Sequence, residues 1–236
     1  MQGKTLKSLT PQIQWDPQWA HTVTGTPISL YQNNHRLPAD SSLRPYLFVG
    51  GVHGDEPEGV RLAEDFLLWL KSHSTEQDHP WILIPCLNPD GFHSKQRTNS
   101  QGVDLNRNFP STDWVSSSEK NRYYPGPTPA SEPEVKALSQ LIQDIKPQAI
   151  FHFHSWKPCV VYTGEPGKPY AEILTQGNNY DCHPDIGYPT PGSLGQYGWL
   201  EHQIPVICLE EQEHSSLEEV WPHFQTGLIS LIQDKV

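Results

Sequence analysis

Two side chains that could hold a metal ion, His53 and Glu56, stand three residues apart in the segment 50–59, GGVHGDEPEG. An apolar run ends and a helical pattern begins at this segment, so a turn there can direct both side chains to one point. A catalytic zinc site needs three nitrogen or oxygen ligands from the protein and an open fourth position for water. The alternative interpretation is a helix N-terminus whose acidic residues favour the helix dipole, with His53 in solvent. This spacing is short enough to arise by chance, so the segment leaves both interpretations open.

A third metal ligand is expected from the segment 149–156, AIFHFHSW. The period-2 alternation of a strand puts the imidazoles of His152 and His154 on the same face of a sheet. His154 lies nearer to the end of the strand, where sites on α/β sheets open, so we favour His154 as the ligand. His152 is then expected to be a core residue or to contact the ligand histidine.

A pair of carboxylates, Glu210 and Glu211, follows the apolar run 205–209. A carboxylate at such a strand end can take a proton from water and pass it to a leaving amine. Adjacent residues of a strand point to opposite faces, so only one of the two can face a metal held by a neighbouring strand. The alternative is a solvated strand end without a catalytic role.

Two arginines ten residues apart, Arg97 and Arg107, lie in the long segment 88–129, which has little periodicity. Guanidinium groups bind carboxylates in a bidentate manner and stabilise oxyanions. Asp104 lies between them and could orient a metal-bound imidazole by accepting a hydrogen bond from it. The alternative is a surface loop with ordinary exposed arginines. A loop of this length in a compact domain is usually functional, or else contains elements that the pattern does not reveal.

The elements that must position these residues alternate between strands and helices along the chain. Strands are expected at 28–31, 46–50, 81–87, 149–154, 160–162 and 205–209, and helices at 58–71, 134–145, 171–178, 193–203 and 217–232. Ser131-Glu132-Pro133-Glu134 has the form of a capping box, so we expect a helix to start there. This alternation predicts an α/β fold, with one domain over residues 1–236 around a mixed, mostly parallel sheet.

The composition excludes several classes of partner. The 236 residues include 16 Lys and Arg against 27 Asp and Glu, a net charge of -11, without the positive clusters that nucleic acids and anionic membranes require. No apolar run approaches the roughly 18 residues of a membrane-spanning helix, and no apolar region of a secretory signal follows the first residues. We therefore expect no nucleic-acid partner, no membrane association and a cytoplasmic location.

The four cysteines have no C-x-x-C spacing; they are Cys86, Cys159, Cys182 and Cys208. We expect them to be packing thiols. A disulfide between Cys159 and Cys182 is the alternative, which a reducing compartment disfavours.

Five motifs, in this order, resemble the zinc carboxypeptidases of the M14 type. They are His53-Gly54-Asp55-Glu56, Asn88-Pro89-Asp90-Gly91, Arg97 with the run 102–110 (GVDLNRNFP), His154-Ser155 and Leu209-Glu210. The segments 124–134 and 187–195 look like the bacterial murein peptide amidase A branch of that family. The resemblance implies a single α/β/α domain with a twisted mixed sheet.

Carried over to this sequence, the resemblance implies one zinc ion bound by three residues, His53, Glu56 and His154. It implies that Glu210 is the general base and acid. It also implies that Arg97 polarises the scissile carbonyl and stabilises the oxyanion.

The resemblance also implies residues that bind the substrate. Asn106 and Arg107 match the pair that holds the free carboxylate of the substrate's last residue. Tyr188 is the candidate for a mobile tyrosine over the substrate, and Tyr197 is its competitor.

The activity that the resemblance implies is zinc-dependent removal of a C-terminal residue with a free carboxylate from a small peptide. The branch suggests murein tripeptide, L-Ala-γ-D-Glu-meso-diaminopimelate, cut before the diaminopimelate. Glu211 and Trp156 depart from the family pattern, and we expect both to reshape the pocket.

Two other functions compete with this one. A deacylase of the aspartoacylase or succinylglutamate desuccinylase type shares the His-Gly-x-Glu and Asp-Leu-Asn-Arg elements. A binding module that keeps the zinc site without catalysis would not need Glu210, which is present.

Overall fold

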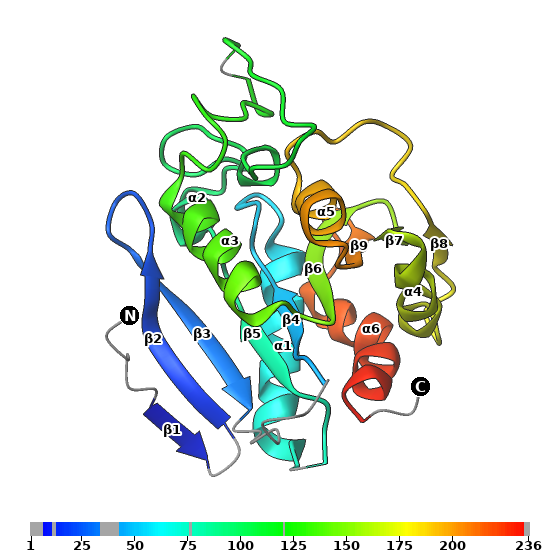
Figure 1. Ribbon diagram of the computed structural model, residues 1–236. Coiled ribbons are helices and arrows are strands. Elements are labelled where there is room, and N and C mark those ends of the chain that lie inside the picture. Colours follow the sequence, from blue (N-terminus) through cyan, green and yellow to red (C-terminus); the bar gives the residue numbers. More distant parts are fainter. Residues whose placement is uncertain (1–6, 11–12, 34–42, 76, 120, 234–236) are drawn as a thin grey trace.

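The computed structural model describes residues 7–10, 13–33, 43–75, 77–119 and 121–233 (Figure 1). Within these ranges the chain forms one sheet with helices packed against both of its faces. This is the layered α/β arrangement that the alternating patterns predicted.

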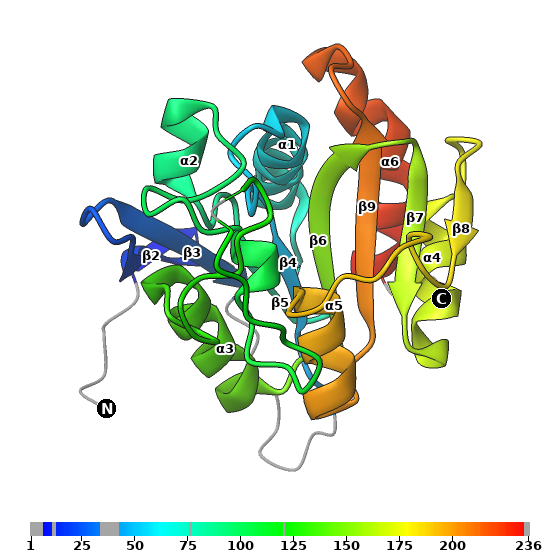
Figure 2. The ribbon, with the colours of Figure 1, turned by 90° about the horizontal axis from the view of Figure 1, so that it is seen from above.

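The sheet is mixed, with its parallel part mainly at the centre. Its described strands are β1 (Lys7–Thr10), β2 (Ile13–His21), β3 (Pro27–Asn33), β4 (Tyr46–Val49), β5 (Trp81–Ile84), β6 (Ala149–Trp156), β7 (Cys159–Thr163), β8 (Asp181–His183) and β9 (Val206–Gln212). Their order is β1-β2-β3-β5-β4-β6-β9-β7-β8. Strands β5, β4, β6 and β9 are parallel to one another, as are β7 and β8, whereas the remaining neighbours are antiparallel. Figure 2 shows the strand direction turning from β2 to β8, so the expected twisted mixed sheet is confirmed.

Helices cover the sheet on both sides. They are α1 (Pro57–His73), α2 (Pro89–Ser94), α3 (Pro133–Ile145), α4 (Lys168–Leu174), α5 (Leu194–Gln196) and α6 (Leu217–Ile232), with the 3-10 turns η1 (Leu105–Arg107) and η2 (Glu165–Gly167) and the π-helical turn η3 (Tyr197–Glu201). Helices α1, α4 and α6 pack on one face, and α3, α5 and η3 on the other (Figure 2). A bilayer-spanning helix, which must be long and apolar throughout, does not occur in the described part of the chain.

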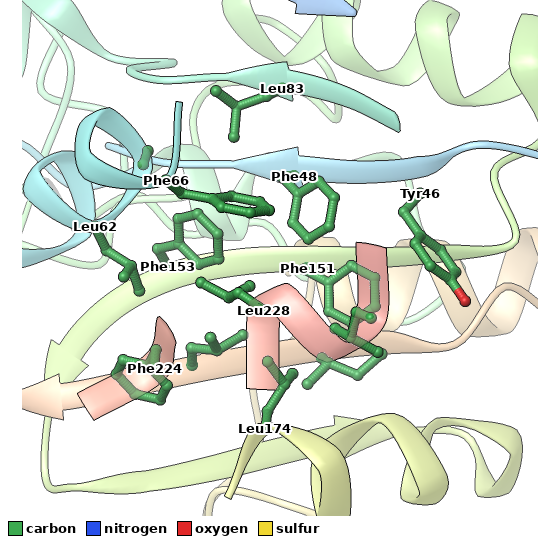
Figure 3. Close-up of a cluster of buried hydrophobic side chains, with 14 of the residues drawn as sticks. Tyr46, Phe48, Leu62, Phe66, Leu83, Phe151, Phe153, Leu174, Phe224 and Leu228 are labelled. Carbon is green, nitrogen blue, oxygen red and sulfur yellow. The ribbon is translucent and has the colours of Figure 1, made fainter. Parts of the chain in front are cut away.

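Aromatic side chains dominate one face of the sheet. Tyr46 and Phe48 on β4, and Phe151 and Phe153 on β6, point to this face and pack with Phe66 of α1 (Figure 3). The rings of Phe48 and Phe151 are stacked with centroids 4.9 Å apart. Burying one such side chain contributes about 1.5–3 kcal/mol. This packing holds α1 against the sheet, and the first turn of α1 borders the candidate site.

Aliphatic side chains dominate the opposite face. Leu47 and Val49 on β4 and Ile150 on β6 alternate with the aromatic residues and contact the side of α3 that carries Leu138 and Ile142. Because β4 and β6 are buried on both faces, they read as nearly continuous apolar runs. A histidine inside such a strand therefore needs a polar partner.

Some elements escaped the sequence analysis. Strands β1, β2 and β8 and helix α2 were not predicted, and α4 begins and ends earlier than the expected range 171–178. Strand β2 reads IQWDPQWAH, in which Asp16 and Pro17 interrupt the apolar alternation. Its register against β3 shifts between Asp16 and Ala20, an irregularity that accommodates a proline within the pairing.

The predicted capping box at the start of α3 is wrong in its details. The helix starts at Pro133, as expected, but its N-cap is Glu132. The Ser131 hydroxyl donates to Glu132 Oε1 over 2.6 Å and accepts a hydrogen bond from Asn108 Nδ2 over 2.9 Å. Ser131 therefore ties the long loop to the helix start and does not cap the helix.

Candidate active site

The turn between β4 and α1 brings His53 and Glu56 together. Gly50 continues β4 and donates its backbone N–H to the carbonyl of Ile84, the last residue of β5. The carbonyls of Gly50 and Gly51 accept hydrogen bonds from the chain that follows β5. Gly51 has a φ of 59°, which a side chain would strain. Glu56 is the N-cap of α1, so the two candidate ligands lie where a strand ends and a helix begins.

Strand β6 supplies the histidines from the next position in the sheet. His152 and His154 lie on the same face, as the period-2 alternation predicted, with His154 Nε2 and His152 Nδ1 2.8 Å apart. In the parallel pairing of β6 with β9, His154 is opposite Glu210. The carboxyl ends of β4, β6 and β9 therefore deliver the predicted ligands and the predicted base to one place.

Possible metal-ligand atoms of three side chains converge in this place. His53 Nδ1 lies 2.8 Å from Glu56 Oε1, and His154 Nδ1 lies 2.7 Å from Glu56 Oε2. The two Nδ1 atoms are 3.0 Å apart. All three residues are buried. Two imidazole nitrogens and a carboxylate that converge in this way match the donor set of catalytic zinc.

The other nitrogen of each imidazole also has a partner. His53 Nε2 lies 3.2 Å from Asp104 Oδ1, and His154 Nε2 faces His152. Such contacts fix the orientation of metal-binding imidazoles. A second group of possible ligand atoms, formed by His152, His154 and Cys208, overlaps the first at His154.

The charges around the cluster fit these roles. Burial opposes ionisation of Glu56, but His53 and His154 outweigh it and hold the pKa of Glu56 well below its ordinary value. Burial likewise opposes ionisation of Asp104, and His53 and then Arg97 hold the pKa of Asp104 far below its ordinary value. Both carboxylates are therefore available as acceptors at neutral pH. Burial lowers the pKa of His152 as well, which keeps this imidazole neutral.

Glu210 lines the pocket beside the cluster. Burial, followed by the charge of Glu56, raises the pKa of Glu210 to about 8. Cys208, on the same side of β9, lies 3.1 Å from Glu210 Oε1 through its sulfur and donates to it. Burial beside another carboxylate is a common way to adjust a carboxyl group for proton transfer.

Glu211 lies on the other side of β9 and does not reshape the pocket, so this expectation was wrong. It is buried, accepts a hydrogen bond of 2.7 Å from Tyr180 and lies 2.8 Å from His223 Nδ1. The alternation of the strand is the reason, because it turns neighbouring side chains to opposite faces. The other departure, Trp156, does line the pocket.

The two predicted arginines are held by the loop that follows α2. Arg97 donates from Nε to Asp104 over 2.9 Å and from a terminal nitrogen to Glu56 over 3.2 Å. Asp104 also accepts from the backbone of Asn106 and thereby caps the turn η1, which carries Asn106 and Arg107. Leu194 donates its backbone N–H to Asn106 Oδ1, which leaves the amide nitrogen of Asn106 as a donor. Arg97, Asn106 and Arg107 all line the pocket.

The two candidate tyrosines have different environments. Tyr188 is 47% exposed, lines the pocket and meets Trp156 edge to face with ring centroids 6.0 Å apart. Tyr197 is 2% exposed, stacks on Phe109 and accepts a hydrogen bond from Gln143. Only Tyr188 of these two is positioned to contact a molecule in the pocket.

Arg122 and Tyr123 are among the pocket residues that the sequence analysis missed. The pocket has a volume of about 310 Å³, and these residues line it together with Arg97 and Arg107. Three of the six arginines in the sequence therefore meet in one pocket of a protein with a net charge of -11. The signal available in the sequence was a cation beside an aromatic residue near the end of the long loop.

The sequence also matches a known family. The family model described as zinc carboxypeptidase matches residues 5–197. The chain belongs to this family of zinc-dependent enzymes.

Within this family, the chain is similar to murein peptide amidases. The chain is 34% identical to murein peptide amidase A of Escherichia coli (strain K12) over 173 residues, which cover 68% of this chain and 69% of that protein. It is 30% identical to murein peptide amidase A of Vibrio campbellii over 199 residues, which cover 79% and 77% of the two chains. The crystal structure of murein-tripeptide amidase from Escherichia coli O157 superposes with a TM-score of 0.75 at 25% identity, covering 98% of each chain.

Proposed function

We propose that this zinc carboxypeptidase acts on murein tripeptide and hydrolyses the bond between γ-D-Glu and meso-diaminopimelate. The observation that carries the proposal is one pocket that combines a cluster of two histidines and a glutamate, the carboxyl group of Glu210 and three arginines. The similarity to two murein peptide amidases supports the choice of substrate.

The proposed metal ligands are His53, Glu56 and His154, which would hold one zinc ion. Their buried nitrogen and oxygen atoms and the orienting contacts of Asp104 and His152 fit such an ion. When bound, zinc supplies Lewis-acid chemistry to the scissile carbonyl and to the attacking water.

Glu210 and Arg97 carry the chemistry that belongs to the chain. In its ionised form, the Glu210 carboxylate takes a proton from the attacking water and passes it to the amine of the leaving diaminopimelate. The Arg97 guanidinium, held by Asp104 and Glu56, donates hydrogen bonds to the oxygen that becomes negative. Because both contacts are in place before substrate binds, this donor needs little reorganisation during the reaction.

Substrate recognition begins with the free carboxylate of the last residue. Arg107 offers a planar fork that suits a carboxylate, and Asn106 adds an amide donor from the same turn. Tyr188, at the exposed rim beside Trp156, covers the bound residue.

The competing deacylase function is not favoured by the comparisons, which match the chain to peptidases and murein peptide amidases. The cytoplasmic location and the absence of nucleic-acid partners stay predictions of the sequence. Cell fractionation with an antibody to the chain tests the location.

The decisive assay uses zinc-loaded protein with murein tripeptide, a panel of ordinary dipeptides, N-acetylaspartate and succinylglutamate. We expect mass spectrometry to detect free diaminopimelate from the tripeptide and slower or no cleavage of the others. A chelator-treated sample is the control. Faster hydrolysis of either N-acyl amino acid than of the tripeptide would reverse the choice between the two functions.

The role of Arg107 has its own test. Amidation of the substrate's terminal carboxyl group should lower kcat/KM of the wild type by about 100-fold, because a charged pair is lost. The same amidation should change kcat/KM of Arg107→Ala little. Arg107→Lys keeps the positive charge but not the planar guanidinium, so its loss of kcat/KM on amidation should lie between those of the wild type and Arg107→Ala. Equal losses in wild type and Arg107→Ala would exclude this role.

A further inference from the structure

Arg122 is an arginine of the pocket to which the proposed function gives no role. One terminal nitrogen lies 3.4 Å from Asp55 Oδ2, and the side chains of Arg122 and Asp55 are 55% and 34% exposed. Exposed ion pairs of this kind contribute little to stability. The guanidinium is therefore free to exchange this partner for a carboxylate that enters the pocket.

The ring of Tyr123 lies beside Arg122 and beside the two arginines to which the proposed function gives a role. The guanidinium carbons of Arg97, Arg107 and Arg122 lie 5.2, 5.8 and 5.4 Å from the centroid of the Tyr123 ring. Their depths differ, because the side chain of Arg97 is only 12% exposed. Arg122 thus lies on the same wall as the predicted oxyanion donor but closer to solvent, where the part of the substrate before the scissile bond must lie.

The chemistry of a γ-linked glutamate favours a cation in this region. When a glutamyl residue is joined through its side chain, its α-carboxyl group stays free, four bonds from the scissile carbonyl carbon. Standard bond lengths place it about 5 Å from that carbon in an extended chain. An ordinary α-linked peptide has neutral backbone there. A guanidinium that reaches the position of this carboxylate therefore distinguishes a γ-linked substrate from an α-linked one.

We propose that Arg122 binds the free α-carboxylate of the γ-linked glutamyl residue and selects γ-glutamyl substrates over ordinary peptides. This inference rests on the proposed function and names the group that recognises the residue before the cleaved bond. The guanidinium of Arg122 lies over the Tyr123 ring, and this cation–π contact favours its position at the pocket.

Two substrates that differ in a single group test the inference. One is L-Ala-γ-D-Glu-meso-diaminopimelate, and the other carries an α-carboxamide in place of the glutamyl α-carboxylate. We expect the wild type to prefer the carboxylate form by about 10- to 100-fold in kcat/KM, the range typical of hydrogen bonds to charged groups. Arg122→Ala should lose this factor on the carboxylate form and cleave both forms at similar rates.

Controls separate recognition from general damage. Arg61 is another arginine in an ion pair, with Asp65 on α1, in which Arg61 is 40% exposed, and it does not line the pocket. Arg61→Ala should keep the wild-type preference, and Arg122→Lys should keep part of it. Calorimetric titration of both substrates into Glu210→Gln, with and without Arg122→Ala, should show the same preference in Kd.

Three results would overturn the inference. A wild type that cleaves both forms equally, or an Arg122→Ala variant that keeps the full preference, excludes this role while the proposed function stands. A wild type that cleaves neither form, although it hydrolyses other peptides, removes the proposed function and this inference together.

Discussion

His152 and His154 differ in which atoms they face, and this difference predicts their roles. Of these two, His154 presents a nitrogen to Glu56, at 2.7 Å, whereas His152 contacts the far nitrogen of His154. We expect His154→Ala to lose bound zinc. His152→Ala should keep zinc with about 10- to 100-fold weaker affinity, because an orienting contact is lost.

Zinc content per chain after dialysis, measured by atomic absorption, checks this prediction. Wild type and Cys208→Ala serve as references, because Cys208 belongs only to the overlapping group of possible ligands. Zinc lost from Cys208→Ala as well as from His152→Ala and His154→Ala would assign the metal to that second group. Zinc kept by His154→Ala would contradict His154 as a ligand.

Substitutions of the adjacent residues Glu210 and Glu211 should affect different properties, the first catalysis and the second stability. Glu210→Gln removes the proposed base from the pocket, so kcat should fall by orders of magnitude while zinc stays bound. Glu211→Gln disturbs the buried contacts with Tyr180 and His223. The latter variant should unfold more easily, by about 1–3 kcal/mol, with kcat close to that of the wild type.

Zinc analysis, steady-state kinetics and urea unfolding of both variants separate these effects. An active Glu210→Gln beside an inert, stably folded Glu211→Gln would exchange the two roles. Activity in both would remove the general-base mechanism.

At the scale of elements, the turn after β4 depends on close contact with α2. A Cβ atom added to Gly54 would lie 2.0 Å from the carbonyl carbon of Gly91, so one backbone would have to move. We expect Gly54→Ala to lower the free energy of unfolding by about 1–3 kcal/mol and to weaken zinc binding, because this turn carries His53 and Glu56.

Gly102→Ala is the control for backbone effects. Gly102 has a φ of 74° but no atom within 4 Å of an added Cβ. Gly102→Ala should lower the free energy of unfolding by about 1–2 kcal/mol through backbone conformation alone and leave zinc affinity unchanged. Equal zinc affinity in Gly54→Ala and wild type would show that the turn tolerates a larger separation from α2.

At the scale of the whole molecule, stability should depend on pH through Glu134. This residue is fully buried at the start of α3, and burial raises its pKa from 4.5 to about 7. The folded state then holds more protons than the unfolded state between these values, so stability falls as pH rises from about 4.5 to about 7 and levels off above. The loss amounts to about 3 kcal/mol.

Glu134→Gln should remove this contribution. The variant should be more stable than wild type at pH 8, with the difference shrinking towards pH 4.5. Urea unfolding across this range measures it, and Glu218→Gln on the exposed first turn of α6 is the control. A wild type and Glu134→Gln with parallel pH profiles would contradict the raised pKa.

Much of the architecture and the candidate site could be read from local patterns. The apolar runs at β4, β6 and β9 and the helical periods at α1, α3 and α6 were expected close to their observed bounds. Burial on one face or on both produces these periods, so they are visible in single segments. His53, Glu56, His154, Glu210 and Arg97 were named because each follows or ends such a segment, or belongs to a motif.

Contacts between distant segments could not be read in this way. His53 and His154 are 101 residues apart, and the positions of Tyr188, Tyr197, Glu211 and Arg122 relative to the pocket depend on how β6, β9 and the long loop come together. A period states that a side chain faces one side of its own element. Which residues the side chain contacts on that side depends on strand order, register and the path of loops. These follow from the packing of the whole chain.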